Sequence, residues 1–219
     1  AGGTAMGYQA LCSNTTGDNN TAFGLETLSK NTTGATNTAV GRDALEANTT
    51  ASCNTAVGFS AMAANTTGCG NTAVGRQALD ANTTGDRNVA IGRDALSSNT
   101  TADYNTAVGS EAMEVNSTGV ENTAVGFKAL QYNTTGDKNT AVGAYSLDAN
   151  TTGSCNVAMG RVSLTSNTEG DFNVGIGHHA LSANTTADNN TALGYYSLAV
   201  NTTGTENTAV GQNALVKNT

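Results

Sequence analysis

The chain has 219 residues and a formal net charge of −8, with 9 Lys and Arg residues against 17 Asp and Glu residues. Charged residues make up 12% of it and aromatic residues 5%, and Trp and Pro are absent. No basic stripe could neutralise phosphates, which argues against a nucleic-acid partner. No apolar run approaches the roughly 20 residues that a membrane-spanning helix needs, so we expect no membrane insertion in this segment.

A strict 17-residue repeat organises the sequence from end to end. Residues 71–87 read NTAVGRQALDANTTGDR, and the rest of the chain can be laid over this unit in steps of 17 without insertion or deletion. Such a period is typical of solenoids and arrays. We therefore interpret residues 1–219 as a single tandem-repeat array. Because both ends fall inside a repeat, we expect it to be a segment of a longer fibre.

The unit begins with an alternating pattern that predicts a short strand. When positions are numbered 1 to 17 from Asn71, position 2 is Thr or Val, position 3 is small, and position 4 is always apolar. Alternation with β-branched residues on one face favours a β-strand. We expect position 4 to lie in the core, which assigns to it Val40, Val57, Val74 and Ile91.

Two positions that never vary along the array predict corners. Position 5 is Gly in every unit, and Gly adopts positive φ without steric cost. Position 12 is Asn in every unit, and Asn tolerates the left-handed region and bonds its own backbone. Position 15 is Gly or Ala, which indicates a need for smallness more than for positive φ. The corner residues include Gly7, Gly41, Gly75, Gly109, Asn14, Asn48, Asn82 and Asn116.

The remaining regular features complete the predicted fold. Position 9 is Leu or Met throughout, which makes Leu45, Leu79 and Leu96 core residues. Recurrent Gly and Asn and paired β-branched threonines exclude a helix. The fold class is therefore all-β, a parallel β-solenoid (β-roll) of 13 coils with 17 residues per coil, the last incomplete, stacked about 4.8 Å apart. Stacked Asn side chains either form a ladder between coils or cap their own turns, and the two are compatible.

The variable positions supply the candidates for contacts and chemistry. Positions 6 and 7 carry bulky residues, and aromatic and Arg side chains are common at binding surfaces; the alternative is that they fill crevices or lie along their own coil. We expect His178 and His179 to point in different directions and to make no metal site by themselves. Aspartates recur at position 16, where we favour solvated charge over weak Ca²⁺ binding. The candidate surface contacts are Arg76, Arg93, Phe127, Tyr195 and Tyr196.

Cysteines and sequons raise two questions about covalent chemistry. Cys53 and Cys69 lie 16 residues apart, one place off register in adjacent coils, and are a candidate disulfide if the turn aims both sulfurs outward. Eleven units contain Asn-Thr-Thr or Asn-Ser-Thr at position 12. These match the N-glycosylation motif, but we favour an Asn ladder with Thr rows as their explanation.

The run NTAVG, followed by AL and then NTTG, is similar to the repeats of trimeric autotransporter adhesin heads and of phage and bacterial tail-fibre-like proteins. The likeness covers the whole chain, although the 17-residue unit is longer than the head repeats. The resemblance implies a left-handed roll, packed as a homotrimer with the residue before each Gly facing the trimer interior. The small number of large side chains per coil also favours a homo-oligomer, because an isolated stack of such coils would be only marginally stable.

These features favour a rigid, repetitive structural fibre or adhesin segment at a cell surface, outside the cell or on a virion. Its partners would be copies of itself and a host-surface or matrix glycan or protein. One alternative is an ice-binding solenoid with Thr ladders, and another is a non-catalytic part of a tail spike. No nucleophile or paired-carboxylate set stands out from the repeat, so we predict no enzyme and no cofactor.

Overall fold

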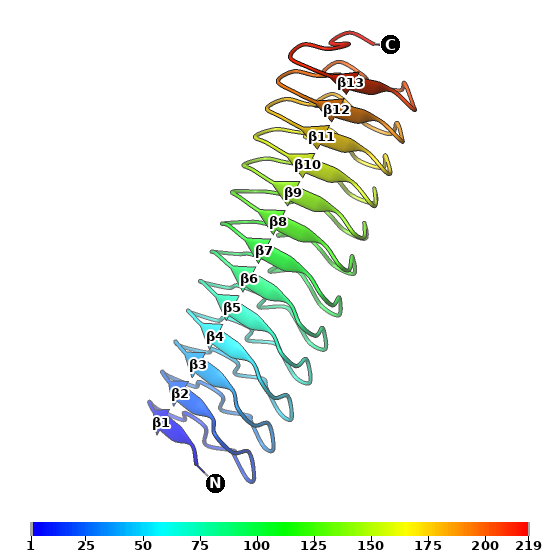
Figure 1. Cartoon of the computed structure of the whole chain (residues 1–219). Helices are drawn as coiled ribbons and strands as arrows, with labels where there is room; N and C mark the ends of the chain where they lie inside the picture. Colours follow the sequence, from blue (N-terminus) through cyan, green and yellow to red (C-terminus); the bar gives the residue numbers. More distant parts are fainter. Residues whose placement is uncertain (1, 219) are drawn as a thin grey trace. The chain divides into compact units, whose positions relative to one another are not determined.

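The computed structural model describes residues 2–218, and every regular element in that range is a β-strand. The chain forms a 13-stranded parallel sheet in sequence order, which confirms the predicted β-solenoid (Figure 1). It divides into two compact units, each made of several repeats: the first unit is Ala1–Ala107 and the second unit is Val108–Thr219. The strands are β1 (Thr4–Met6), β2 (Thr21–Phe23), β3 (Thr38–Val40), β4 (Thr55–Val57), β5 (Thr72–Val74), β6 (Val89–Ile91), β7 (Thr106–Val108), β8 (Thr123–Val125), β9 (Thr140–Val142), β10 (Val157–Met159), β11 (Val174–Ile176), β12 (Thr191–Leu193) and β13 (Thr208–Val210).

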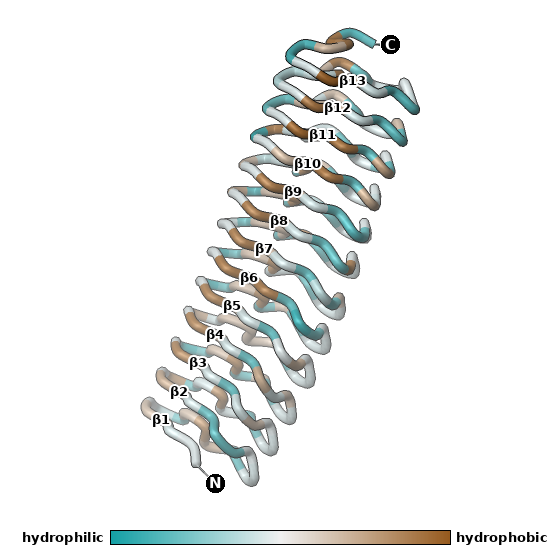
Figure 2. Tube along the Cα trace, viewed as in Figure 1, coloured by the Kyte–Doolittle hydropathy of each residue, from teal (hydrophilic) through white to brown (hydrophobic). Residues whose placement is uncertain are grey.

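Strand pairing follows the sequence repeat without slippage. In the first unit Thr38 of β3 pairs with Thr55 of β4, and in the second Thr123 of β8 pairs with Thr140 of β9, so each partner is the equivalent residue one repeat later. Each unit is therefore a stack of one-repeat coils, and hydrophobic residues recur at the same place in successive coils (Figure 2). Each strand covers only positions 2 to 4, and turns make up the rest of the coil.

The strands turn position 3, rather than position 4, toward the interior. From β2 onward the Ala residues at position 3 are buried, whereas Val40, Val74 and Ile91 keep 38%, 36% and 40% of their surface exposed and Val57 is half-buried. The expectation that position 4 belongs to the core of the coil is therefore wrong for the single chain. The coil is thin, and the interior beside a strand has room for little more than a methyl group.

In the coils from Leu28 to Leu198, position 9 supplies the one large apolar side chain that is completely buried. Leu45, Leu79 and Leu96 are completely buried and adopt left-handed backbone conformations with φ of 52°, 55° and 51°. A left-handed L-residue costs about 1–2 kcal/mol, and burying a Leu side chain contributes about 1.5–3 kcal/mol, so burial offsets the strain. β-Branched residues tolerate this conformation least, which explains why position 9 is Leu or Met and never Val or Ile.

The other non-Gly residues with positive φ lie at positions 7 and 17, for example Gln77 at 54° and Arg87 at 54°. Among residues 2–218, no Asn at position 12 has positive φ, so the left-handed conformation expected there is wrong. Instead, two tight turns bend the chain. In the first, the N–H of position 8 donates to the carbonyl of position 5, as in Ala78 to Gly75 at 3.4 Å. In the second, the N–H of position 12 donates to the carbonyl of position 9.

The Gly at position 5 is needed for both conformation and contact. Gly75 has φ of +141°, and a Cβ on it would lie 2.4 Å from the carbonyl oxygen of Gly92 in the next coil. Position 15 differs, because none of its Gly residues among the described ones has positive φ, and Ala51, Ala102 and Ala187 occupy the same position. The requirement at position 15 is therefore small size.

Two substitutions in one coil separate these requirements. Gly126→Ala places a side chain at φ +137° and against the backbone of Gly143, so we expect it to lower the free energy of unfolding by at least about 2 kcal/mol. Gly136→Ala also brings a Cβ to 2.3 Å from the carbonyl oxygen of Gly153. Because φ at position 15 is not positive and three other repeats carry Ala there, we expect this change to cost less. Urea unfolding of the two variants measures the difference, and equal losses would contradict this account of position 5.

Candidate functional site

A continuous ladder of buried Asn side chains runs through each unit at position 12. The Nδ2 of Asn82 donates to Oδ1 of Asn65 at 2.9 Å, and the Nδ2 of Asn65 donates to Oδ1 of Asn48 at 3.1 Å. The same Nδ2 also donates within its own turn, as in Asn82 to the carbonyl oxygen of Gly85 at 3.0 Å. Both arrangements expected from the sequence therefore exist together, and each amide uses both of its hydrogens.

A second row of buried Asn side chains lies at position 1. The Oδ1 of Asn20 accepts the backbone N–H of Asn37 in the next coil at 2.9 Å. Its Nδ2 donates to the carbonyl oxygen of Gly34 at 2.7 Å, and the same oxygen also accepts from Nδ2 of Asn31 at 2.9 Å. The two Asn rows thus meet at the carbonyl of position 15, which joins the beginning of a coil to its end.

The Asn ladder determines how the sequons behave in the folded chain. Asn82 of the Asn-Thr-Thr sequence at 82–84 is completely buried, and both of its amide hydrogens are engaged. A glycosyl group on that nitrogen would displace the ladder and the turn bond together. In the folded coil the motif therefore serves packing and hydrogen bonding.

Polar side chains at positions 13 and 16, in the outer turns, also form hydrogen bonds between adjacent coils. The hydroxyl of Thr83 donates to the carbonyl oxygen of Thr100 in the next coil at 3.1 Å. At position 16, Oδ1 of Asp86 accepts the N–H of Cys69 at 2.7 Å, and Oγ of Ser52 accepts the N–H of Ala35 at 3.0 Å. The aspartates of position 16 thus act as acceptors for the preceding coil, a role that the sequence did not suggest.

An exposed face is formed by the outward side chains of the strands. Position 2 is half-buried in most coils, and position 4 beside it carries exposed apolar side chains one coil apart. In the first unit this position 4 row includes Phe23, Val40, Val74 and Ile91, and in the second it includes Val125, Val142, Met159 and Leu193. The position 4 row is thus a regular apolar feature that each unit presents to solvent.

The candidate surface residues of positions 6 and 7 occupy a neighbouring face. Arg93 pairs with the next residue, Asp94, at 2.6 Å, and Arg76 donates to the adjacent Gln77. Phe127 meets the ring of Tyr145 edge-on at 5.4 Å. These contacts fit the alternative in which such side chains lie along their own or a neighbouring coil.

In the second unit, four rings from two adjacent coils form a cluster. His178 and His179 contact each other with centroids 4.4 Å apart, so the expectation that they point apart is wrong. Position 7 is left-handed, with φ of 58° at His179, and this removes the alternation of an extended strand. His179 stacks on Tyr196 at 4.5 Å, and His178 stacks on Tyr195 at 5.6 Å.

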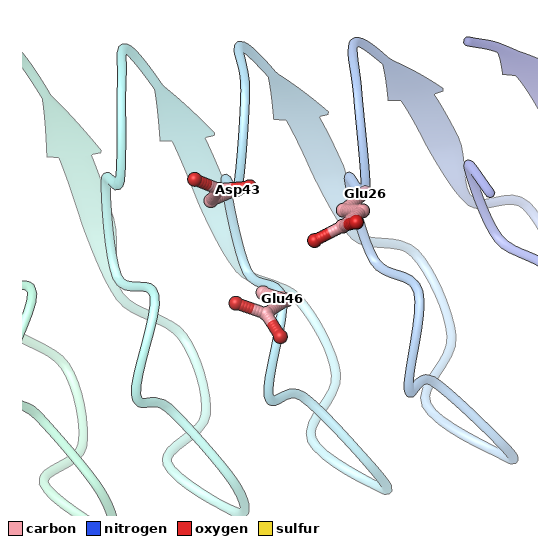
Figure 3. Close-up of side chains that lie close together, drawn as sticks. All are labelled: Glu26, Asp43 and Glu46. Carbon is pink, nitrogen blue, oxygen red and sulfur yellow. The ribbon is translucent and has the colours of Figure 1, made fainter. Parts of the chain in front are cut away.

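Three carboxylates of the first unit, Glu26, Asp43 and Glu46, place one oxygen each within 4.8 Å of the others (Figure 3). They are half-buried and come from two adjacent coils. Cations already accompany two of them, because Arg42 Nε lies 3.1 Å from Asp43 and Lys30 Nζ lies 2.8 Å from Glu46. This contact with Glu46 raises the pKa of Lys30. The three carboxylates therefore form a local charge network with Lys30 and Arg42. One oxygen from each lies close enough to the others for all three to contact a single cation.

The candidate disulfide between Cys53 and Cys69 is not formed, and both thiols are free, as are those of Cys12 and Cys155. The sulfur of Cys53 lies 3.2 Å from the hydroxyl of Thr36 in the preceding coil. The sulfur of Cys69 instead bonds the carbonyl oxygen of Thr67 within its own coil at 3.3 Å. The one-place offset in register therefore directs the two side chains to different partners.

Two further observations and the comparisons with known proteins complete the description. Residues 2–218 form no pocket, and none of their elements is a helix long and apolar enough to cross a membrane. No family model, curated protein or solved structure matches the chain.

The energetic weight of the Asn ladder can be tested at Asn167. Its amide donates to Asn150 at 3.0 Å and to Gly170 at 3.0 Å, and its oxygen accepts from Asn184 at 2.8 Å. Asn167→Ala removes all three bonds at a buried position and should lower the free energy of unfolding by about 2–4 kcal/mol. The exposed Glu169→Ala, two residues away, is the control and should change it by less than about 0.5 kcal/mol in urea unfolding. Similar effects of both changes would contradict a stabilising ladder.

Proposed function

We propose that this chain is a segment of a structural fibre that associates with copies of itself through the position 4 row and acts as a rigid, repetitive spacer. The exposed position 4 row carries this proposal. Val74 and Ile91 stand in adjacent coils with more than a third of their surface in solvent. Contiguous exposed apolar surface of this kind marks sites of protein association.

A second copy of the chain is the partner whose geometry fits this row best. The apolar side chains recur once per coil, so a partner with the same period meets every one of them, whereas a surface without that period meets one or two. Association would also add apolar burial to coils that each enclose a single Leu or Met. The resemblance to trimeric adhesin heads favours a parallel homotrimer with this row at its centre.

The setting of this fibre follows from the same resemblance. Adhesin heads and tail-fibre-like repeats belong to surfaces outside the cell or on virions, and we extend that localisation to this segment. Its variable positions 6 and 7 would then face a host-surface or matrix glycan or protein.

A second candidate function, the binding of ice, gains support from position 2. Thr72 and its equivalents at this position lie on the outward face of the strands, and their hydroxyls have no recorded partner among residues 2–218. The threonines at position 13 instead donate to carbonyl groups. A regular outward row of Thr beside Val could order water. Because the same face serves both proposals, a monomer that shows thermal hysteresis would favour this second function.

Self-association is tested by placing charge in the proposed seam. The double change Val74→Asp and Ile91→Asp should convert the oligomer to monomer, because desolvating two carboxylates at an apolar contact is costly. Both side chains point to solvent in the single chain, so the coils should still form. Sedimentation velocity measures the mass, and Thr67→Asp with Thr84→Asp, in the exposed row at position 14, is the control. An unmodified chain that sediments as a stable monomer would refute the proposal.

The spacer role is tested by deleting one coil. Removing residues 71–87 joins two equivalent positions and should preserve cooperative unfolding and assembly, since each coil contacts only its neighbours. Removing residues 71–86 instead leaves one extra residue at the junction. This residue moves a corner Gly of position 5 or Asn of position 12 off its row, and the melting temperature should fall sharply. Circular dichroism melting and sedimentation distinguish the two. The spacer role is contradicted if deleting one particular coil abolishes attachment to the proposed host-surface or matrix partner in a chain that still folds, while deleting either neighbouring coil does not.

A further inference from the structure

Among residues 2–218, the ring cluster of the second unit brings together more aromatic rings than any other group of side chains. His178 lies parallel to Tyr195 with an interplanar angle of 10°, and Tyr195 contacts Tyr196 at 4.6 Å. Half of the surface of Tyr195 is exposed. The stacking of equivalent positions and the bond from the N–H of Tyr196 to the carbonyl of His178, at 3.0 Å, fix the rings as a platform.

An unpaired cation stands beside this platform. Arg161 occupies position 6 of the preceding coil, and its carbonyl oxygen accepts the N–H of His179 at 3.3 Å. Arg42 and Arg93, at the same position in the first unit, each pair with a following Asp. Arg161 is followed by Val162, and its guanidinium has no recorded ion pair or hydrogen bond among residues 2–218.

The local electrostatics favour an anion. Positions 4, 6, 7 and 10 of the three coils that begin at residues 156, 173 and 190 contain no Asp or Glu, although the whole chain has a net charge of −8. Burial lowers the pKa of His179, and the neighbouring His178 and Arg161 lower it further, as expected in a positive field. The coil before Arg161 does carry a carboxylate at position 10, Asp148, which accepts the hydroxyl of Thr165 at 2.5 Å. No salt bridge joins Asp148 to Arg161 among residues 2–218, so the guanidinium of Arg161 stays available to an anionic group.

We propose that Arg161 and the platform of Tyr195, Tyr196, His178 and His179 bind a carboxylate-bearing sugar. The exposed half of Tyr195 offers apolar ring surface against which the C–H face of a pyranose packs. The guanidinium of Arg161 has the planar geometry that binds a carboxylate through two parallel hydrogen bonds. The phenol groups of Tyr195 and Tyr196 can donate to and accept from sugar hydroxyls, whereas Nδ1 of His178 is buried. This site goes beyond the spacer role and does not depend on it.

The experiment uses the full chain with three probes: trigalacturonate, the neutral galactotriose of the same linkage, and tetraglutamate. We expect titration calorimetry to show trigalacturonate binding at least about tenfold more tightly than galactotriose, because only the former offers Arg161 a carboxylate. Tetraglutamate should bind at least about tenfold more weakly than trigalacturonate, since it has charge without a pyranose face.

Variants assign the contacts. Arg161→Gln should abolish the preference for trigalacturonate over galactotriose, and Tyr195→Ala should weaken the binding of both sugars by about tenfold. Arg93→Gln, at the equivalent position of the first unit, is the matched control and should leave binding unchanged. Unaltered melting curves will show that the coils of each variant are intact.

Three outcomes would overturn the proposal. The first is the absence of trigalacturonate binding by the unmodified chain at millimolar concentration. The second is equal binding by the Arg161→Gln and Tyr195→Ala variants. The third is equal affinity for tetraglutamate, which would show that charge alone is recognised. None of these outcomes bears on self-association, which sedimentation measures separately.

Discussion

The fold depends on one recurring interaction, the convergence of two Asn amides on the carbonyl of position 15. In the coil that begins at Asn20, the carbonyl oxygen of Gly34 accepts hydrogen bonds from Asn20 and Asn31. Asn20 opens the coil and Gly34 lies near its end, so the shared oxygen closes the loop. The remaining amide groups then bond to the neighbouring coils. Closure of a coil and stacking of coils are therefore fixed by the same side chains, which explains why the repeat length does not vary.

This interaction also sets the limits of the core. The interior of a coil holds two buried Asn side chains, a small residue at position 15, Ala at position 3 and a single Leu or Met at position 9. A coil of this kind gains much of its order from hydrogen bonds that water cannot reach, and each such bond is costly to leave unmade. The larger apolar side chains are consequently displaced to the outside, at position 4. The exposed apolar row is thus a consequence of the closure mechanism.

The sequence was sufficient to predict the solenoid, the coil length, the strands and the Asn ladder, because each of these follows from a strict period and from residue types with one dominant behaviour. It did not reveal which face of the strand is internal. Val74 is larger and more apolar than Ala73, and ordinary hydrophobic patterning places it inside; only the thickness of the coil, known from the structure, reverses that order. Position 9 did carry a usable signal, since the exclusion of β-branched residues agrees with its positive φ. The contact between His178 and His179 was missed because the left-handed conformation at position 7 has no Gly to indicate it.

The separation of scaffold from surface explains how one repeat can carry different chemistry along its length. The backbone bonds of positions 6 and 7 use only main-chain atoms, as in Tyr196 to His178 and Gln77 to Phe59, so the side chains there are free to vary. In the first unit this freedom produces charge pairs such as Arg93 with Asp94, which neutralise each other. In the second it brings Arg161, which is followed by Val162 instead of Asp, next to stacked rings. A periodic scaffold thus presents a site with no period of its own, and that site is where recognition can be selective although every coil has the same fold.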